Sequence, residues 1–238
     1  MYTDYSRFSE VYDGCGASEF SLTMGSSIIR FLDNEEAWDE RIKNHLDLCC
    51  GTGELCAFFV KMGYNSKGLD LSSEMLGLAE KKYPGIVFSL EDVTKPLSEE
   101  GYDTVTCVDD AVNHITDREQ VKGLISNAFN ALISGGYFFF DMVDPEYTDF
   151  DVQYPVCMRE DYSITYEISS ADPKTITNHI RCLKDGHIAW ESRISEYMYT
   201  CDEMTEMLID AGFEVVLVDK DFYDEKSLMK WKFVCKKY

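Results

Sequence analysis

The sequence predicts an α/β protein in which a doubly wound, mostly parallel sheet of seven strands carries an inserted antiparallel β-sheet. Helical and strand patterns alternate over residues 44–141, as in parallel sheets with crossover helices. Over residues 146–199 three β-type runs follow one another instead. A helix and two strands then return to the first arrangement. We therefore expect residues 1–145 and 200–238 to form one domain, and residues 146–199 to form an insertion.

Five strand cores are expected in the first part of the chain. They cover residues 45–49, 66–70, 86–90, 103–108 and 136–141. Ser72 is the expected N-cap of a helix that ends before Pro84. The run Thr116-Asp117-Arg118-Glu119 predicts a capping box for a further helix, which Gly135 is expected to close.

The rest of the chain predicts three antiparallel strands, then a helix and two more strands. The antiparallel runs are Ser163 to Ile168, Thr175 to Leu183 and Ile188 to Tyr199, joined by turns at Asp172-Pro173 and Asp185-Gly186. The run Thr200-Cys201-Asp202-Glu203 is a second capping box, and its helix is expected to stop at Gly212. Strands at 213–218 and 231–236 complete the larger sheet.

The insertion is expected to cover the active site, because ligands of open α/β sheets bind beyond the carboxyl ends of the strands. Its aromatic residues could enclose a small substrate. They are Tyr154, Tyr162, Tyr166, Trp190, Tyr197 and Tyr199. The alternative is that these rings attach the small sheet to the core or to another subunit.

The segment Asn44 to Leu55 predicts a buried strand that runs into a glycine turn and then a helix. Gly51 and Gly53 would let a nucleotide-like ligand approach bare backbone. Asp70, seventeen residues after Gly53, ends the next strand and could accept hydrogen bonds from both ribose hydroxyls. Together these features predict an adenosine site.

A dinucleotide is the less suitable ligand for this turn. Its fingerprint requires a third glycine where this chain has Cys56. Asp47 and Glu54 also flank the place where a diphosphate would lie, and they would repel it. The two carboxylates instead suit an ammonium or a sulfonium.

The segment Leu46 to Glu54 resembles the first motif of class I S-adenosylmethionine-dependent methyltransferases, which have a Rossmann-like fold. Residues 68–76, 90–93 and 102–114 resemble later motifs of that family, in the family's order. The resemblance implies S-adenosylmethionine as cofactor and S-adenosylhomocysteine as product. It implies cofactor contacts from Asp47, Cys49, Gly51, Thr52, Gly53, Asp70, Leu71, Met75, Glu91, Asp92, Val93, Val108, Asp109 and Asp110.

The N-terminal segment Tyr5 to Asp13 resembles the opening of bacterial amino-sugar N-dimethyltransferases and glycine N-methyltransferases. In those enzymes a tyrosine of this segment folds over the cofactor, and the resemblance implies that role for Tyr12. Phe8 and Val11 are expected to be the apolar face of a short helix packed on the domain.

The implied reaction is an in-line displacement at a methyl group that the sulfonium already activates. The protein must mainly align the reactants and exclude water, so no universal catalytic residue is required. A base is needed only if the acceptor carries a proton, and His114 and Asp110 are the candidates. The alternative for His114 is a packed structural histidine.

Composition restricts the class of substrate. With 22 basic and 44 acidic residues the chain carries a formal charge of −22, which disfavours nucleic acids and anionic membranes as partners. The nine cysteines are scattered without a Cys-x-x-Cys pair, so we expect reduced thiols and no metal site. No apolar stretch is long enough to span a bilayer, and the polar start is no signal peptide, so a cytoplasmic location is expected.

The sequence therefore favours methyl transfer to a small-molecule acceptor, with N-methylation ahead of O-methylation, in a monomer or homodimer. Two alternatives stay open. One is a non-catalytic S-adenosylmethionine-binding or assembly module, since the cofactor site would be the same. The other is a nicotinamide-dependent oxidoreductase, which Cys56 and Asp47 disfavour.

Overall fold

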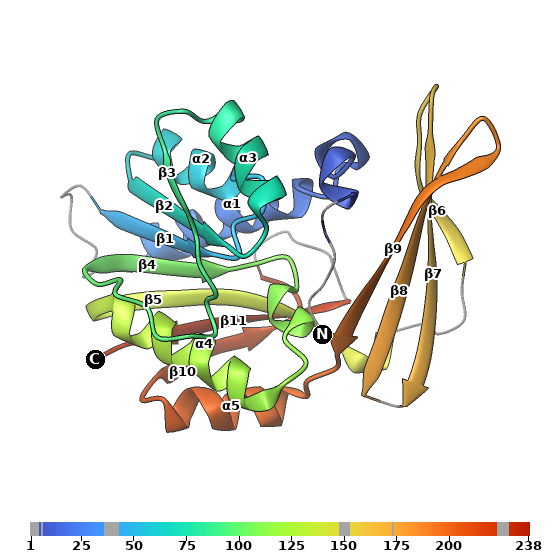
Figure 1. The fold of residues 1–238 in the computed structure, drawn as a ribbon. Helices are drawn as coiled ribbons and strands as arrows, with labels where there is room; N and C mark the ends of the chain where they lie inside the picture. The colour runs from blue at the N-terminus through green and yellow to red at the C-terminus, as the bar shows by residue number, and fades with distance from the viewer. Residues whose placement is uncertain (1–4, 6, 36–42, 148–152, 173, 223–228) are drawn as a thin grey trace.

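The structure is a computed structural model that describes residues 5, 7–35, 43–147, 153–172, 174–222 and 229–238. These residues form a seven-stranded and a four-stranded sheet (Figure 1). The order in the larger sheet is β10-β11-β5-β4-β1-β2-β3, and of these strands β11 (Lys230–Lys236) is the one that runs antiparallel to its neighbours. The expected fold class is confirmed.

The strands of the larger sheet begin and end within a few residues of the expected cores. They are β1 (Asn44–Leu48), β2 (Asn65–Asp70), β3 (Val87–Leu90), β4 (Tyr102–Cys107), β5 (Leu132–Val143) and β10 (Glu214–Asp219). β1 pairs in parallel with β2 on one side and with β4 on the other. The strand order reverses at β1, and such a reversal places a crevice at the carboxyl ends of these strands.

Helices cover both faces of this sheet (Figure 1). They are α1 (Glu19–Asp33), α2 (Glu54–Lys61), α3 (Ser73–Lys82), α4 (Arg118–Ala131) and α5 (Cys201–Asp210). Alternate residues of β5 explain the two layers. Phe138 and Phe140 belong to the apolar cluster of α4 and α5, whereas Tyr137 and Phe139 belong to that of α1 and α2.

Two of the expected helix caps are confirmed. Ser72 accepts a hydrogen bond from the Met75 amide at 3.2 Å, and α3 ends at Lys82, before Pro84. Thr200 and Glu203 form the reciprocal capping box at the start of α5.

The expected bounds of α4 are wrong at both ends. The N-cap is Asp117 rather than Thr116, because the Asp117 carboxylate accepts the amides of the first helical turn. The helix ends at Ala131, since the next residue is already extended, and Gly135 lies inside β5 with a φ of 84°. An aspartate at the N-cap serves as well as a threonine, so the capping-box pattern places the start of this helix one residue too early.

The smaller sheet lies between β5 and α5 in the chain. Its strands are β6 (Gln153–Met158), β7 (Ser163–Asp172), β8 (Thr175–Lys184) and β9 (His187–Tyr197), all antiparallel. The sequence indicated the last three but not β6. Asp185 and Gly186 have φ values of 52° and 77° and make the expected two-residue turn. Pro173, in the other expected turn, lies outside the described residues.

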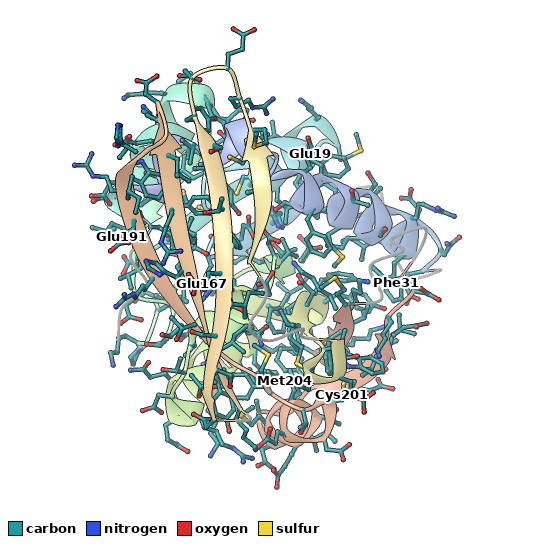
Figure 2. The ribbon with its side chains drawn as sticks, turned by 90° about the vertical axis from the view of Figure 1, so that its right-hand side faces the viewer. Glu19, Phe31, Glu167, Glu191, Cys201 and Met204 are labelled. Carbon is teal, nitrogen blue, oxygen red and sulfur yellow. The ribbon has the colours of Figure 1, made fainter. Side chains whose placement is uncertain are left out.

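The inner face of the smaller sheet packs on the N-terminal segment. Phe8 in η1 (Phe8–Glu10) and Val11 share an apolar cluster with Ile164, Ile180 and Ile194. The apolar face of the N-terminal segment therefore packs against the inserted sheet rather than the larger one, which corrects the expectation. Figure 2 shows the smaller sheet face-on in front of the rest of the molecule.

Among the described helices, none combines the length and the apolar character that a membrane crossing requires. The division of the chain into domains at residues 145 and 200 stays a prediction.

Candidate active site

A cavity of about 580 Å³ opens where β1, β2 and β4 end. This volume lies within the usual range for small-molecule sites. The sequence-predicted residues on its wall are Tyr12, Asp47, Cys49, Gly51, Thr52, Asp70, Leu71, Met75, Glu91, Asp92, Val93, Val108, Asp109 and His114. Gly53 and Asp110 are not among the residues that line it.

The two glycines after β1 serve different purposes. Both have positive φ values, 53° for Gly51 and 82° for Gly53. A β-carbon on Gly51 would meet no atom within 4 Å, whereas one on Gly53 would lie 2.7 Å from the ring of Phe88. Gly51 therefore exposes backbone to the cavity, and Gly53 allows the start of α2 to pack against β3.

Asp70 holds the glycine turn from the end of β2. Its two carboxylate oxygens accept the amides of Gly51 and Ser72, both at 2.8 Å. A carboxylate has about four acceptor directions, so about two stay available for a ligand. Burial raises the pKa of Asp70 despite these amides.

Asp47 ends a row of hydrogen bonds that crosses the sheet. The Thr106 hydroxyl donates to Asp47 at 2.6 Å and lies 2.9 Å from Nε2 of His45, whose Nδ1 lies 2.8 Å from the Ser66 hydroxyl. Burial lowers the pKa of His45 to about 3, so the ring is neutral. Because the Thr106 hydroxyl donates its hydrogen to Asp47, its oxygen must accept from the Nε2–H of His45. The row fixes the carboxylate, and burial raises the pKa of Asp47 to about 7.

The N-terminal segment is tied to the larger domain beside this cavity. The Asp13 carboxylate, in η2 (Asp13–Cys15), accepts the Thr52 hydroxyl at 2.7 Å and pairs with Lys82 at 2.6 Å. The Tyr12 hydroxyl donates to Asp109 at 2.9 Å. Tyr5 also lines the cavity, although the sequence reasoning did not select it.

Three carboxylates surround one lysine at the end of β4. The amides of Asp109 and Asp110 donate to the Asp141 carboxylate of β5 at 2.7 and 2.8 Å. The ammonium of Lys230 lies 2.9 Å from Asp109, 2.5 Å from Asp110 and 3.5 Å from Asp141. Asp109 and Asp110 have φ values of 65° and 48°, a conformation that non-glycine residues rarely adopt. Burial raises the pKa of Asp141 to about 7.

His114 lies at the end of η3 (Ala111–His114), which follows β4. Its Nε2 is 3.0 Å from the Tyr5 hydroxyl, while its buried Nδ1 has no hydrogen-bond partner in the part of the chain that the structure describes. Burial lowers the pKa of His114, against the attraction of Asp110. Asn113 instead bridges β9 and β5, through the Tyr197 carbonyl at 2.8 Å and the Val143 amide at 3.0 Å.

The sequence reasoning missed Glu196 and its partner Asn178. Glu196 is 5% exposed and faces inward from β9, and the Asn178 amide of β8 donates to it. A carboxylate oxygen of Glu196, a carboxylate oxygen of Asp110 and a ring nitrogen of His114 lie within 4.8 Å of one another. The sequence held a signal for Glu196, because it is a carboxylate at an inward-facing position of the strand, two residues after the buried Ile194.

The described aromatic residues of the inserted sheet do not form the expected enclosure. None of its described aromatic side chains lines the cavity. Tyr162, Tyr166 and Trp190 pack in the cluster that contains Phe8, and the Tyr199 hydroxyl donates to the Ile115 carbonyl at 2.6 Å. The Tyr154 side chain lies outside the described residues. Tyr5 and Tyr12 are the tyrosines of the wall.

The loop after β3 closes another side of the cavity. One oxygen of Asp92 accepts the Thr94 amide at 3.0 Å and the Thr94 hydroxyl at 2.6 Å. Val93 is buried on the wall beside it. The local turn therefore fixes the Asp92 side chain at the edge of the cavity.

Comparisons with known proteins agree with this geometry. Residues 46–136 match the family model of a methyltransferase domain. A protein of Geobacillus sp. (strain WCH70) that carries a provisional methyltransferase name is 28% identical over 194 residues, which cover 77% of this chain and 78% of that protein. A ubiquinone biosynthesis O-methyltransferase of Hydrogenovibrio crunogenus is 32% identical over 115 residues, 45% of this chain and 46% of that enzyme.

Solved structures share the whole fold. An S-adenosylmethionine-dependent methyltransferase from Clostridium acetobutylicum has a TM-score of 0.82 at 20% identity, with 98% of both chains covered. An amino pentose methyltransferase from Micromonospora echinaspora, solved with S-adenosylmethionine, has a TM-score of 0.79 at 19% identity, with 96% of this chain and 97% of that chain covered.

Proposed function

We propose that this chain, which is a class I S-adenosylmethionine-dependent methyltransferase, methylates an amine nitrogen of a small-molecule acceptor. S-adenosylmethionine supplies a methyl group that the sulfonium charge already activates. The protein residues bind the two reactants, align them and keep water away.

The cavity suits S-adenosylmethionine on three observations. Asp70 has acceptor directions to spare for two ribose hydroxyls, and Gly51 presents open backbone. Asp47 lines the cavity, and its ionised form favours a sulfonium over a diphosphate, whereas Glu54 beside it pairs with Lys82. We assign Asp70 to the ribose, Asp92 and Val93 to the adenine, and Asp47 with the glycine turn to the methionine part.

The acceptor would bind at the end of β4, beside Asp109 and His114. There the wall includes Tyr5 and Tyr12 of the N-terminal segment. The inserted sheet at 146–199 supports that segment through the cluster around Phe8, so it would act on the site mainly by holding the segment in place. A cavity of this size suits a small molecule rather than a polymer.

The observation that favours nitrogen over oxygen is the excess of carboxylates around His114. Asp109, Asp110 and Asp141 share one lysine, and Glu196 lies close by. Such a field attracts an ammonium and repels the phenolate that O-methylation of a phenol requires. The amino pentose enzyme and a sugar N-methyltransferase share the fold, which supports the proposal.

Oxygen methylation is the second candidate, because the curated ubiquinone biosynthesis O-methyltransferases resemble part of this chain. The deciding experiment measures methyl transfer from S-adenosylmethionine to a panel of amino sugars, alkylamines, catechols and phenols, with each product identified by mass and NMR. The proposal expects N-methyl products. Turnover confined to catechols or phenols would reject it in favour of O-methylation.

A further inference from the structure

We propose that Glu196, Asp110 and His114 form a three-point site for the ammonium group of the acceptor, and that Glu196 takes the proton which must leave before methyl transfer. This inference rests on the proposed function and adds the form in which the acceptor binds. It also assigns a role to a residue of the inserted sheet.

The geometry of the three acceptors carries the argument. One polar atom from each residue lies within 4.8 Å of the other two. An atom placed at the centre of these three is therefore at most 4.8/√3, about 2.8 Å, from each of them. That is the length of a good hydrogen bond between a charged nitrogen and its acceptor. A primary ammonium has three N–H donors. It can therefore satisfy Glu196, Asp110 and His114 at once. Of these three residues only His114 lines the cavity, so the ammonium would lie beyond His114, behind the cavity wall.

One ring nitrogen of the site has no hydrogen-bond partner. Nδ1 of His114 is buried and has no partner within the described chain. Among the same residues, no lysine or arginine nitrogen comes within 4 Å of the Glu196 carboxylate. The Lys230 ammonium contacts Asp110, and it also pairs with Asp109 and Asp141. A buried ring nitrogen without a partner is costly, and a ligand that pairs with it removes the cost.

The charges that face Glu196 favour the same ligand. They are Asp109 and Asp110 at the end of β4, His114 in η3 and Lys230 in β11, with the Tyr5 hydroxyl nearby. Burial and Asp110 raise the pKa of Glu196 to about 8. Near neutrality the empty site therefore holds a proton on Glu196, and a bound ammonium displaces it. Lys230, whose ammonium is 2.5 Å from Asp110, repels a divalent metal more strongly than an ammonium, because the metal carries twice the charge.

The proton step balances within the pair. An N–H bond of the ammonium breaks, its electron pair stays on nitrogen as the lone pair that will attack, and the proton bonds to a carboxylate oxygen of Glu196. Positive and negative partners become a neutral amine and a neutral acid. A base with a pKa near the working pH is well matched to this transfer. Asn178 donates to the other part of the carboxylate and is a positioning residue.

The test compares Glu196→Gln with Glu191→Gln. The first substitution keeps a carbonyl oxygen that can accept the bond from Asn178 but removes the charge, whereas Glu191 lies on the outer face of the same strand and pairs with His179. The substrate is the amine that turns over best in the panel above. We expect Glu196→Gln to raise the Michaelis constant of the amine about tenfold to a hundredfold, and to remove one ionisation from the pH profile of kcat/KM. The Michaelis constant of S-adenosylmethionine and all properties of Glu191→Gln should stay within about twofold.

A binding experiment separates this inference from the proposed function. Methylammonium is titrated into ¹⁵N-histidine-labelled protein with S-adenosylhomocysteine, and the ring nitrogens of His114 are followed by NMR. We expect methylammonium to shift the His114 signals in the parent and in Glu191→Gln, and to lose that effect in Glu196→Gln.

Three results would overturn the three-point site. The first is an unchanged pH profile and amine affinity in Glu196→Gln. The second is an equal loss of affinity for both substrates together with a lower melting temperature, which marks a structural residue. The third is a His114 shift caused by Mg²⁺, Mn²⁺ or Zn²⁺ but not by methylammonium. Absence of amine turnover with an intact methylammonium response would reject only the proposed function.

Discussion

Replacement of Asp70 by alanine should damage both the fold and the ribose site, by amounts that can be separated. The carboxylate accepts the amides of Gly51 and Ser72 at 2.8 Å each. Each charged hydrogen bond contributes about 1.5–3 kcal/mol, and the burial that raises the pKa of Asp70 offsets part of the total. We expect the free energy of unfolding to fall by about 2–4 kcal/mol, as measured by urea denaturation.

The same substitution should weaken cofactor binding by about 2–4 kcal/mol, roughly thirtyfold to several hundredfold, because two ribose hydroxyls lose a charged acceptor. Calorimetry with S-adenosylhomocysteine and its 2′-deoxy analogue isolates that contact. The parent should prefer the ribose form, and Asp70→Ala should lose most of this preference.

Thr200→Ala is the matched control, because it removes the side-chain hydroxyl that accepts the Glu203 amide at the start of α5 without touching the cavity. It should lower stability by about 1 kcal/mol and leave affinity unchanged. If Asp70→Ala loses stability but discriminates the two analogues as well as the parent does, Asp70 only holds the turn and the ribose assignment is wrong.

Three further substitutions test the electrostatics and the cover of the site. Asp47 has a pKa of about 7, so the preference for S-adenosylmethionine over its uncharged product should rise from pH 6 to pH 8 as the carboxylate ionises, and Asp47→Asn should flatten this rise in calorimetry. Lys230→Met should lower the free energy of unfolding by about 3–5 kcal/mol. The loss should be smaller at pH 5 than at pH 8, because Asp141 is protonated at the lower pH and no longer needs the lysine. Equal losses at both pH values would contradict this. Tyr5→Phe should change acceptor kinetics and leave cofactor affinity within about twofold, since it removes only the hydroxyl bonded to His114.

The strand positions were predictable because short stretches with apolar residues, such as 137–140 in β5, lie between turn signals. The cofactor side of the cavity followed for the same reason, since Asp47, Gly51 and Asp70 stand at the ends of those strands. Local chemistry fixes such positions, so a single sequence reveals them. Thr116 failed as a cap because the neighbouring Asp117 caps equally well, and Gly135 failed because the helix ends earlier, at Ala131.

The acceptor side could not be read in the same way, because long-range packing assembles it. Lys230 reaches Asp109 across 121 residues of sequence, and no local pattern in β11 marks it. Glu196 approaches Asp110 because β9 packs against η3, where the Asn113 amide donates to the Tyr197 carbonyl. The aromatic residues of the insertion misled the interpretation, since aromatic rings serve packing and ligand enclosure equally well.

Removal of the insertion would also disturb the cofactor side of the cavity. If a short linker replaced residues 146–199, Phe8 and Val11 would lose their packing partners Ile164 and Ile194. The N-terminal segment that carries Tyr12 would be released, and apolar surface would be exposed. Point substitutions are therefore the sharper probes of acceptor recognition.

The most direct test of the account is the identity of the methylated atom. The purified chain is incubated at pH 8 with S-adenosylmethionine and paired acceptors that differ only by an amine or a hydroxyl at the reacting position, and the products are assigned by mass and NMR. We expect methyl transfer to the amine member of a pair, and weak binding of the hydroxyl member. Methylation of hydroxyl members with the amine members untouched would contradict it.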